Sequence, residues 1–389
     1  MNRKTKLLFF ITEDWFFCSH FIDRAVAARE AGYEVAVVCR VNQHSKVIED
    51  CGIRVIPLKM ERKSINPLRD LFFLFNLIRI YRRERPQIVQ HIALKPILYG
   101  TLVALLTGIP RIVNAPVGMG YVFSSRQWKA RLLRPLIMQA YRGLMNPRNG
   151  VTVFENPDDQ DFLVGLKIVD PARTRLIRGA GVNMQRFHPT PEPDGPVLVL
   201  LAARMLWDKG VGEFVEAARL LRHDKLNARF VIAGAPDQDN PAAIPQSQLE
   251  AWQNEGCVEW WGHQSNMPAV LGKTHVFCLP TAYAEGLPKA LIEAAAAGRA
   301  IVTTDAPGCR EVVRNGENGF LIPLRSSHAL ANALRQLIEN SELRKRMGQR
   351  GREIAVAEFS NERICEETLS LYQALVSPQS ADAADASFR

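Results

Sequence analysis

The sequence predicts an α/β protein in which two domains each build a parallel β-sheet covered by helices. Short apolar runs alternate with amphipathic stretches of helical length along the whole chain. Alternation of this kind is typical of parallel sheets with helices on both faces. The length of 389 residues exceeds what a single hydrophobic core usually supports, and it suits two domains. Two Rossmann-like domains with a cleft between them are therefore expected.

The apolar runs place the expected strands. In the first half they are Leu7–Thr12, Glu34–Cys39, Ile88–His91, Arg111–Asn114 and Val151–Phe154. In the second half they are Val197–Ala202, Arg229–Ala233, His275–Leu279 and Ala300–Thr303. Ligands of open parallel sheets bind beyond the carboxyl ends of the strands, so the motifs that follow these runs are candidates for function.

A proline-rich stretch divides the chain. Residues 188–196 contain four prolines, which is typical of a linker between domains. The expected organisation is a first domain over residues 1–185, a linker over 186–196 and a second domain over 197–360. A helix over 361–377 is expected to cross back to the first domain, and the Ser-, Ala- and Asp-rich residues 378–389 to form a disordered tail.

Composition excludes several classes of protein. No run of 18 or more apolar residues occurs, so no membrane-spanning helix is expected. The apolar run Leu7–Ile11 meets Glu13 and Asp14 at once, which favours a first buried strand over a signal peptide. The seven cysteines include no CxxC pair, which indicates reduced thiols in the cytoplasm and excludes a disulfide framework or a zinc site of the usual spacing.

The net charge of +9 is concentrated in two stretches. Residues 126–148 carry six basic side chains and no acid, and residues 61–85 carry seven bases against three acids around the apolar run Leu71–Phe75. Basic and large apolar residues in alternation suit a helix that lies on an anionic membrane surface. A core-facing helix with a solvated basic back fits each stretch equally well. No nucleic-acid-binding motif accompanies the charge, so no nucleic-acid partner is expected.

The most informative segment is Pro280–Glu293, which follows an expected strand and opens an alanine-rich helix. Pro288 suits the first helical turn because its missing N–H would have no partner there. The backbone amides of Gly286, Leu287 and Lys289 would then lie at the positive end of a helix, where an anion or sugar hydroxyls can bind.

Two carboxylates belong to this segment. Glu285 lies on the loop before the helix, and Glu293 lies about a turn and a half into it. Carboxylates accept hydrogen bonds from sugar and ribose hydroxyls. Two glutamates at this spacing are a weak signal alone, but a strand–loop–helix junction with Gly-Leu-Pro makes them candidates for binding.

The second segment, Ala202–Gly210, follows the first strand of the second half. Arg204 and Lys209 leave that strand end together, and a guanidinium with an ammonium can bracket a diphosphate. An ordinary solvated loop pair is the alternative.

These motifs together resemble glycosyltransferase family 4, the retaining group with the two-domain GT-B fold. The resemblance spans essentially the whole chain. Its second-half residues are Arg204, Lys209-Gly210, Pro280-Thr281, Glu285-Gly286-Leu287-Pro288, Glu293, Gly308-Cys309-Arg310-Glu311 and Asn318-Gly319-Phe320-Leu321. A subgroup that builds capsule, O-antigen and lipid-linked oligosaccharides is resembled through Asp14–His20, Gly118–Phe123, Gly181-Val182-Asn183 and Gly234–Pro241.

The resemblance implies a role for each matching residue. Arg204 and Lys209 would neutralise the leaving diphosphate. Glu285, with the amides of Gly286 and Leu287, would hold the donor sugar, and Glu293 would hold the ribose. Retention in this family is described as front-face attack, in which a donor phosphate oxygen takes the acceptor proton. Glu285 as a covalent nucleophile remains an alternative.

The sequence departs from the family pattern in the first half. A Gly-rich turn is common after the first strand, whereas this chain has Thr12–Phe16 there. A His-Gly that relatives carry near the donor sugar is replaced by Val117-Gly118, which leaves the identity of the sugar open. Asp14 and His20 are candidates for the acceptor side, although a lone histidine near a helix start is more often a packing or capping residue.

Two further patterns invite a ligand. The triplets Asp159–Asp161 and Asp237–Asp239 fit a magnesium or manganese site, but acids at a helix start and in a turn explain them equally well. Because Arg204 and Lys209 supply positive charge, no metal and no cofactor is expected beyond the nucleotide sugar. His263, after Trp260 and Trp261, is a candidate for the nucleotide base, with core packing of the tryptophans as the alternative.

The expected activity is transfer of a hexose or N-acetylhexosamine from a UDP-sugar to a lipid-diphosphate-linked saccharide. The expected place is the cytoplasmic face of the inner membrane, with peripheral attachment through the basic helices. Two alternatives stay open: a nucleotide-sugar epimerase or hydrolase on the same fold, and a non-catalytic membrane-surface partner in polysaccharide assembly. A dinucleotide oxidoreductase is disfavoured because no G-x-G-x-x-G follows the first strand.

Overall fold

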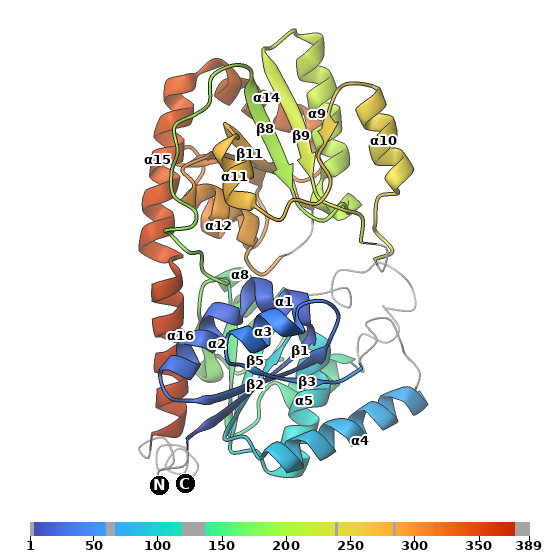
Figure 1. Ribbon diagram of the computed structural model, residues 1–389, viewed down its shortest axis with the longest axis vertical. Helices are drawn as coiled ribbons and strands as arrows, with labels where there is room; N and C mark the ends of the chain where they lie inside the picture. Colours follow the sequence, from blue (N-terminus) through green and yellow to red (C-terminus); the bar gives the residue numbers. More distant parts are fainter. Residues whose placement is uncertain (1–3, 60–66, 119–136, 238–239, 283–284, 378–389) are drawn as a thin grey trace. The chain divides into compact units, whose positions relative to one another are not determined.

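The computed structural model describes residues 4–59, 67–118, 137–237, 240–282 and 285–377 (Figure 1). It divides the chain into two compact units. The first unit runs to Ala180 and resumes at Glu362, and the second comprises Gly181–Asn361. Each unit is a parallel sheet with helices on both faces, which confirms the α/β prediction.

The first unit contains seven strands. They are β1 (Lys6–Glu13), β2 (Glu34–Arg40), β3 (Arg54–Pro57), β4 (Ile88–Ile92), β5 (Arg111–Ala115), β6 (Gly150–Phe154) and β7 (Thr174–Leu176). Its helices include α1 (Asp14–His20), α2 (Ile22–Glu30), α3 (Ser45–Asp50), α4 (Pro67–Glu84), α5 (Leu94–Thr107), α8 (Pro157–Gly165), the 3₁₀ turn η1 (Pro171–Arg173) and α16 (Asn361–Val376). The strands lie in the order β3-β2-β1-β4-β5-β6-β7, and every pairing is parallel.

Successive residues of β1 point to opposite faces of this sheet, as a strand requires. Leu7 and Phe9 pack with helices α1, α2, α3 and α16, whereas Leu8 and Phe10 pack with α4 and α5. Tyr372 of α16 lies fully buried in the first of these two clusters. The helix at the end of the chain is therefore part of the core of the first unit.

The second unit contains six strands. They are β8 (Val197–Ala202), β9 (Ala228–Ala233), β10 (Glu259–Trp260), β11 (Val276–Leu279), β12 (Ala300–Thr304) and β13 (Gly319–Ile322). Its helices include η2 (Trp207–Lys209), α9 (Val211–His223), α10 (Gln246–Asn254), α11 (Met267–Gly272), α12 (Lys289–Ala296), α13 (Cys309–Val312), α14 (Ser327–Glu339) and α15 (Ser341–Glu358). The order β10-β9-β8-β11-β12-β13 matches that of the first six strands of the other sheet.

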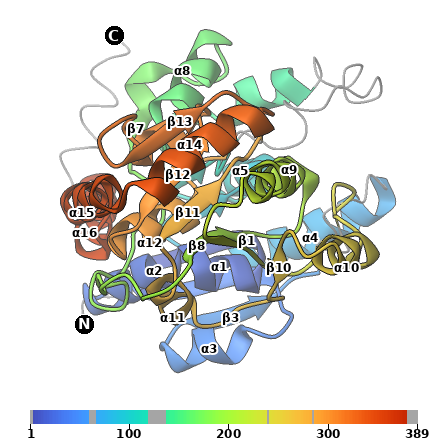
Figure 2. The ribbon, with the colours of Figure 1, turned by 90° about the horizontal axis from the view of Figure 1, so that it is seen from above.

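Helices cover both faces of the second sheet (Figure 2). Residues of α9, α10 and α14 form one core cluster with alternate strand residues, and residues of α11, α12 and α13 form the other. In this strand order the chain reverses direction across the sheet between β8 and β11, and ligands bind at the carboxyl ends of the strands beside such a point.

The strands that the sequence predicted are all present, and they include every interior strand. The strands that it did not predict are β3, β7, β10 and β13, which are the edges of the two sheets. An edge strand is buried less completely, so its apolar signal is weaker. For example, β7 and β10 have only three and two residues.

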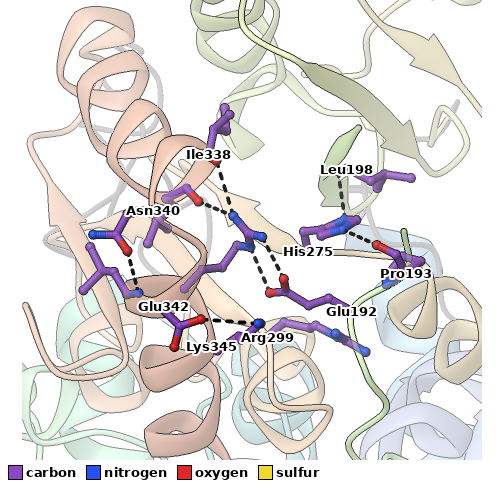
Figure 3. Close-up of polar contacts among 12 residues, drawn as sticks. Glu192, Pro193, Leu198, His275, Arg299, Ile338, Asn340, Glu342 and Lys345 are labelled. Carbon is purple, nitrogen blue, oxygen red and sulfur yellow. Dashed lines mark hydrogen bonds and ion pairs between the residues drawn. The ribbon is translucent and has the colours of Figure 1, made fainter. Parts of the chain in front are cut away.

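The proline-rich stretch differs from the expected linker because it belongs to the second unit. Figure 3 shows polar contacts that Glu192 and Pro193 make there. Arg344 binds both carboxylate oxygens of Glu192, at 2.8 and 2.7 Å. The Nδ1 atom of His275 accepts the Leu198 amide at 3.0 Å, so its Nε2–H donates to the Pro193 carbonyl at 2.9 Å. Buried polar groups therefore fix this stretch on the domain that follows it.

Over the described ranges, no helix combines the length and the apolar character needed to cross a bilayer. The seven cysteines all lie in those ranges, and all are unpaired.

Candidate active site

The site in the second unit begins where two turns meet beyond the strands. The turn η2 follows β8, and its Asp208 carbonyl accepts the Ala282 amide at 2.8 Å and the Thr281 hydroxyl at 3.1 Å. Gly210 permits this contact, because it has a φ of +75° and a Cβ there would lie 2.1 Å from the Pro280 carbonyl oxygen. The loop after β8 and the loop after β11 are therefore held together by backbone contacts.

This contact brings Lys209 and Glu285 together. The Lys209 Nζ atom lies 2.6 Å from the Glu285 Oε1 atom, and the two side chains are only 12% and 16% exposed. The sequence predicted both residues for the site. Their direct pairing was not predicted, because it depends on how closely the two loops approach. A mostly buried ion pair leaves a strongly destabilised charge when one partner is removed.

Gly308 supports the Glu285 loop from behind. Its φ is +78°, and a Cβ at this position would lie 2.4 Å from the Gly286 carbonyl oxygen and 2.8 Å from that of Glu285. The next residue, Cys309, is fully buried. Burial first, and then the Glu285 charge, raise the pKa of the Cys309 thiol to about 12. Cys309 is therefore a neutral packing residue and not a nucleophile.

Helix α12 follows this loop at the expected place. Gly286, Leu287 and Pro288 are buried, and Pro288 is the extended residue directly before the helix. Glu293, about one turn into α12, is 16% exposed, and the Nζ atom of Lys289 lies 4.0 Å from its Oε1 atom. Burial raises the pKa of Glu293, while Lys289 and Arg186 oppose that rise.

Arg204 has a carboxylate partner that the sequence did not point to. Its Nη1 atom donates to Asp237 Oδ2 at 2.8 Å, and the side chains are 45% and 18% exposed. The sequence offers Asp237 as part of the Gly234–Pro241 motif and as a turn residue or metal ligand, but not as a partner of Arg204. Its position shortly after β9, next to the strand that precedes Arg204, is the signal that could have indicated the pairing.

His263 lies at the same edge of the sheet and is exposed. The Gly262 carbonyl before it accepts the Gly234 amide at 2.7 Å, and the Trp260 indole donates to the Gly234 carbonyl at 2.8 Å. Trp260 and Trp261 each pack against one of the two core clusters, so their main role in this unit is packing.

Asp14 in the first unit serves the fold. It is fully buried and accepts the amides of Trp15, Asn42 and His44 at 2.7, 2.7 and 2.9 Å. Burial alone would raise the pKa of Asp14, but hydrogen bonds, chiefly from the His44 and Asn42 amides, hold it below its ordinary value. The carboxylate therefore anchors the segment between β2 and α3.

His20, the other candidate for the acceptor side, lies at the opposite end of α1 from Asp14. Asp14 begins α1 and His20 ends it, so about 9 Å of helix separates their Cα atoms. The His20 ring packs on Phe16, with 4.4 Å between ring centroids. This packing matches the alternative that the sequence left open for a histidine in this helix.

Some sequence expectations fall outside the described residues. They are Met119–Phe123 of the subgroup motif, the basic residues from Arg126 to Arg134, Arg62 and Lys63 of the other basic stretch, Gln238-Asp239 of the second acidic triplet, and the expected tail over 378–389. Where the structure is described, no group of three or more His, Cys, Asp or Glu side chains is arranged to hold a metal ion. Asp159 instead donates its amide to the Asn156 side chain that caps α8, and burial raises the pKa of Asp159 to about 6.

Comparisons with known proteins match this architecture. Residues 184–354 match the family model for glycosyl transferases group 1, and residues 6–146 match the model described as glycosyl transferase 4-like. The chain belongs to glycosyltransferase family 4. It is a glycosyltransferase with the GT-B fold.

Two relatives and one solved structure are instructive. The chain is 28% identical to the N,N'-diacetylbacillosaminyl-diphospho-undecaprenol alpha-1,3-N-acetylgalactosaminyltransferase of Campylobacter jejuni, over 90% of this chain and 93% of the relative. It is 22% identical to the UDP-Gal:alpha-D-GlcNAc-diphosphoundecaprenol alpha-1,3-galactosyltransferase of Escherichia coli, over 80% and 81%. Anabaena Alr3699/HepE in complex with UDP and glucose superposes with a TM-score of 0.77 at 16% identity, over 95% of this chain and all (100%) of that one.

Proposed function

We propose that this glycosyltransferase moves a hexose or N-acetylhexosamine from a UDP-sugar to a lipid-diphosphate-linked saccharide in the synthesis of a surface polysaccharide. The observation that carries the donor half is the mostly buried pair of Lys209 and Glu285 at the carboxyl edge of the second sheet. The acceptor half is supported by two relatives whose names describe sugar transfer to saccharides on diphospho-undecaprenol.

The proposed reaction is retaining and needs no protein nucleophile. The acceptor hydroxyl oxygen attacks C1 of the donor sugar on the face that the diphosphate leaves, and the C1–O bond to the phosphate breaks. The hydroxyl proton passes to an oxygen of the departing diphosphate. Arg204 and Lys209 stabilise the negative charge that develops on this group. Glu285, with the Gly286 and Leu287 amides, orients the sugar.

Glu293 is proposed to bind the ribose and His263 to lie beside the base. Glu293 is partly exposed on α12, and His263 is exposed on the loop after β10. A carboxyl group can accept one ribose hydroxyl or, when neutral, donate to it, so the raised pKa of Glu293 is compatible with this role.

No metal ion is required by this proposal. The second unit supplies Arg204 and Lys209 at the strand ends, and these two cationic side chains are the counter-charge proposed for the leaving diphosphate. Activity is expected to be unchanged in EDTA. A loss that added Mg²⁺ or Mn²⁺ restores would contradict this part.

The first unit is proposed to attach to the membrane through α4. One face of this helix, with Phe73, Leu77 and Tyr81, is buried in the core. Its other face exposes Leu71, Phe72 and Phe75 by 65, 70 and 63% and, further along, Arg79, Arg82 and Arg83. Exposed aromatic and aliphatic side chains beside arginines fit an anionic membrane surface.

The neighbouring helix adds to this surface. In α5, Leu102, Leu105 and Leu106 are exposed by 37, 46 and 63%. Phe73 of α4 contacts Tyr99 of α5, with 5.5 Å between ring centroids, so the two helices pack together. A lipid-linked acceptor lies in a membrane, and attachment at the cytoplasmic face of the inner membrane would bring the enzyme to it. The unpaired state of all seven cysteines is compatible with that compartment.

The proposal is tested by a panel of nucleotide sugars, scored for nucleoside diphosphate release with and without short polyprenyl-diphosphate saccharides. Release that requires one donor and one lipid acceptor, and yields an α-linked product by NMR from an α-linked donor, is expected. Release without acceptor, accompanied by free sugar or an epimer, would instead support a hydrolase or epimerase. No nucleotide binding by any donor would support a non-catalytic partner.

A further inference from the structure

Both cations assigned to the leaving diphosphate are paired with carboxylates. Lys209 contacts Glu285, which already has a proposed role on the donor sugar. Arg204 contacts Asp237, for which the proposed mechanism has no use. The question is why an acidic side chain lies 2.8 Å from an arginine that is to bind an anion.

The fold places Asp237 beside Arg204 through a ladder of backbone contacts. The Met205 amide donates to the Ala235 carbonyl at 3.1 Å, and the Ile244 amide donates to the Met205 carbonyl at 2.9 Å. The Trp207 amide donates to the Ala242 carbonyl at 2.9 Å. The loop after β8 is therefore bonded to the loop after β9 on both sides of Asp237, and the carboxylate is held in register with Arg204.

The pairing has an electrostatic consequence for an anionic ligand. An arginine binds a phosphate most tightly when no other anion shares its guanidinium group. A carboxylate near the diphosphate also repels it, and this repulsion acts on donor and nucleoside diphosphate alike. Repulsion grows with the charge of the ligand, so it is largest for the nucleoside diphosphate that is left after transfer. Because Arg204 is 45% exposed, it has room to exchange one partner for another.

We propose that Asp237 is the counter-ion that Arg204 exchanges for the diphosphate, and that it sets how tightly the enzyme retains the nucleoside diphosphate product. With the site empty, Asp237 holds the arginine in place. When the diphosphate binds, Arg204 turns to it, and the freed carboxylate weakens binding of the more highly charged product. Asp237 is thus a positioning residue that favours product release. The inference rests on the proposed donor class.

The experiment is calorimetric titration of the full-length protein with UDP and with inorganic pyrophosphate. Asp237→Asn keeps a side-chain oxygen for Arg204 but removes the charge. It is expected to bind UDP about tenfold more tightly and to lower kcat, since product release then becomes slower. A fall in kcat together with a fall in KM distinguishes slower release from simple damage to the site.

Glu255→Gln is the matched control, because it also removes one acid from an arginine–carboxylate pair in the second unit. The Arg219 Nη2 atom lies 2.7 Å from Glu255 Oε2, and the side chains are 41% and 45% exposed. UDP affinity of this variant is expected to equal that of the wild type. An equal gain in both variants would mean that net charge alone acts, and would overturn the role of Asp237. Asp237→Ser serves as a second variant if Asp237→Asn does not fold.

Unchanged or weaker UDP binding in folded Asp237 variants would overturn the inference and leave the proposed function intact, since the wild type would still bind UDP. A wild-type protein that binds neither UDP nor pyrophosphate would remove the proposed donor class, and the inference with it.

Discussion

The two units share a strand order but use the ends of their strands differently. In the second unit the loops after β8, β9 and β11 carry two cation–carboxylate pairs. In the first unit the acids at the end of β1, Glu13 and Asp14, bind the Asn42 side chain and backbone, and Glu13 also lies 3.8 Å from Arg40 at the end of β2. A carboxylate at a strand end is therefore not by itself a ligand site. What distinguishes the second unit is that its acids meet cations at hydrogen-bonding distance, 2.8 Å for Arg204 and Asp237 and 2.6 Å for Lys209 and Glu285.

The units also differ in their surfaces. The first unit exposes Leu71, Phe72 and Phe75 on α4, beside Arg79 and Arg82. No comparable run of exposed aromatic and aliphatic side chains is found in the described part of the second unit, where exposed large apolar residues are scattered singly. This difference supports the proposed division of labour, in which the second unit binds the donor and the first unit binds the membrane and the acceptor.

The largest effect is expected when a substitution breaks the Lys209–Glu285 pair. Lys209→Ala removes the cation from a mostly buried carboxylate, and is expected to lower kcat by about a thousandfold. The kcat of Glu285→Ala is expected to fall by a similar factor. Nucleoside diphosphate release measures both. Asp14→Asn, which also alters a buried strand-end acid, serves as the comparison. A similar loss in Asp14→Asn at a temperature where it is folded would contradict the assignment of Asp14 to the fold.

The next effect concerns the support of the Glu285 loop. Gly308→Ala places a Cβ against the Gly286 and Glu285 carbonyls and is expected to lower kcat/KM by about a hundredfold. Gly316→Ala is the matched control, because its φ of +83° is similarly positive while nothing lies within 4 Å of its Cβ. Equal losses in the two variants would show that backbone strain, and not the contact with the loop, is responsible.

A smaller effect is expected at the membrane surface. The double variant Phe72→Ser, Phe75→Ser is expected to bind anionic vesicles about tenfold more weakly, because two exposed rings no longer enter the lipid. Sedimentation with vesicles of phosphatidylglycerol and phosphatidylethanolamine measures the binding. UDP affinity should not change. Vesicle binding equal to that of the wild type would reject α4 as the attachment site.

The sequence predicted interior elements better than edges and contacts. Interior strands such as β1 and β8 carry continuous apolar runs, whereas the edge strand β10 consists of Glu259 and Trp260 alone. Arg204, Lys209 and Glu285 could be predicted because they are charged residues that follow expected strands, where ligands of parallel sheets bind. Asp237 was missed, because its pairing depends on the backbone ladder between two loops. The supporting role of Gly308 depends on how closely its backbone approaches the Gly286 and Glu285 carbonyls, and no sequence pattern predicts such a distance.

The smallest expected effect is on stability, at Asp14. Hydrogen bonds lower the pKa of Asp14 in the folded state, so its carboxylate stabilises the fold above the unfolded pKa near 3.8, and this contribution is lost as the pH falls through the folded value. Asp14→Asn is expected to cost about 1–2 kcal/mol at pH 7. Thermal unfolding at several pH values measures it. The difference from the wild type should shrink in acid, and a difference that stays constant would contradict the assignment.

The central claim is that donor binding belongs to the second unit and membrane binding to the first. The most direct test titrates UDP into Lys209→Ala and into the Phe72→Ser, Phe75→Ser variant, beside the wild type. The account predicts UDP binding weakened about a hundredfold in the first variant and unchanged in the second. Equal UDP affinity in Lys209→Ala and the wild type, or an equal loss in both variants, would contradict it.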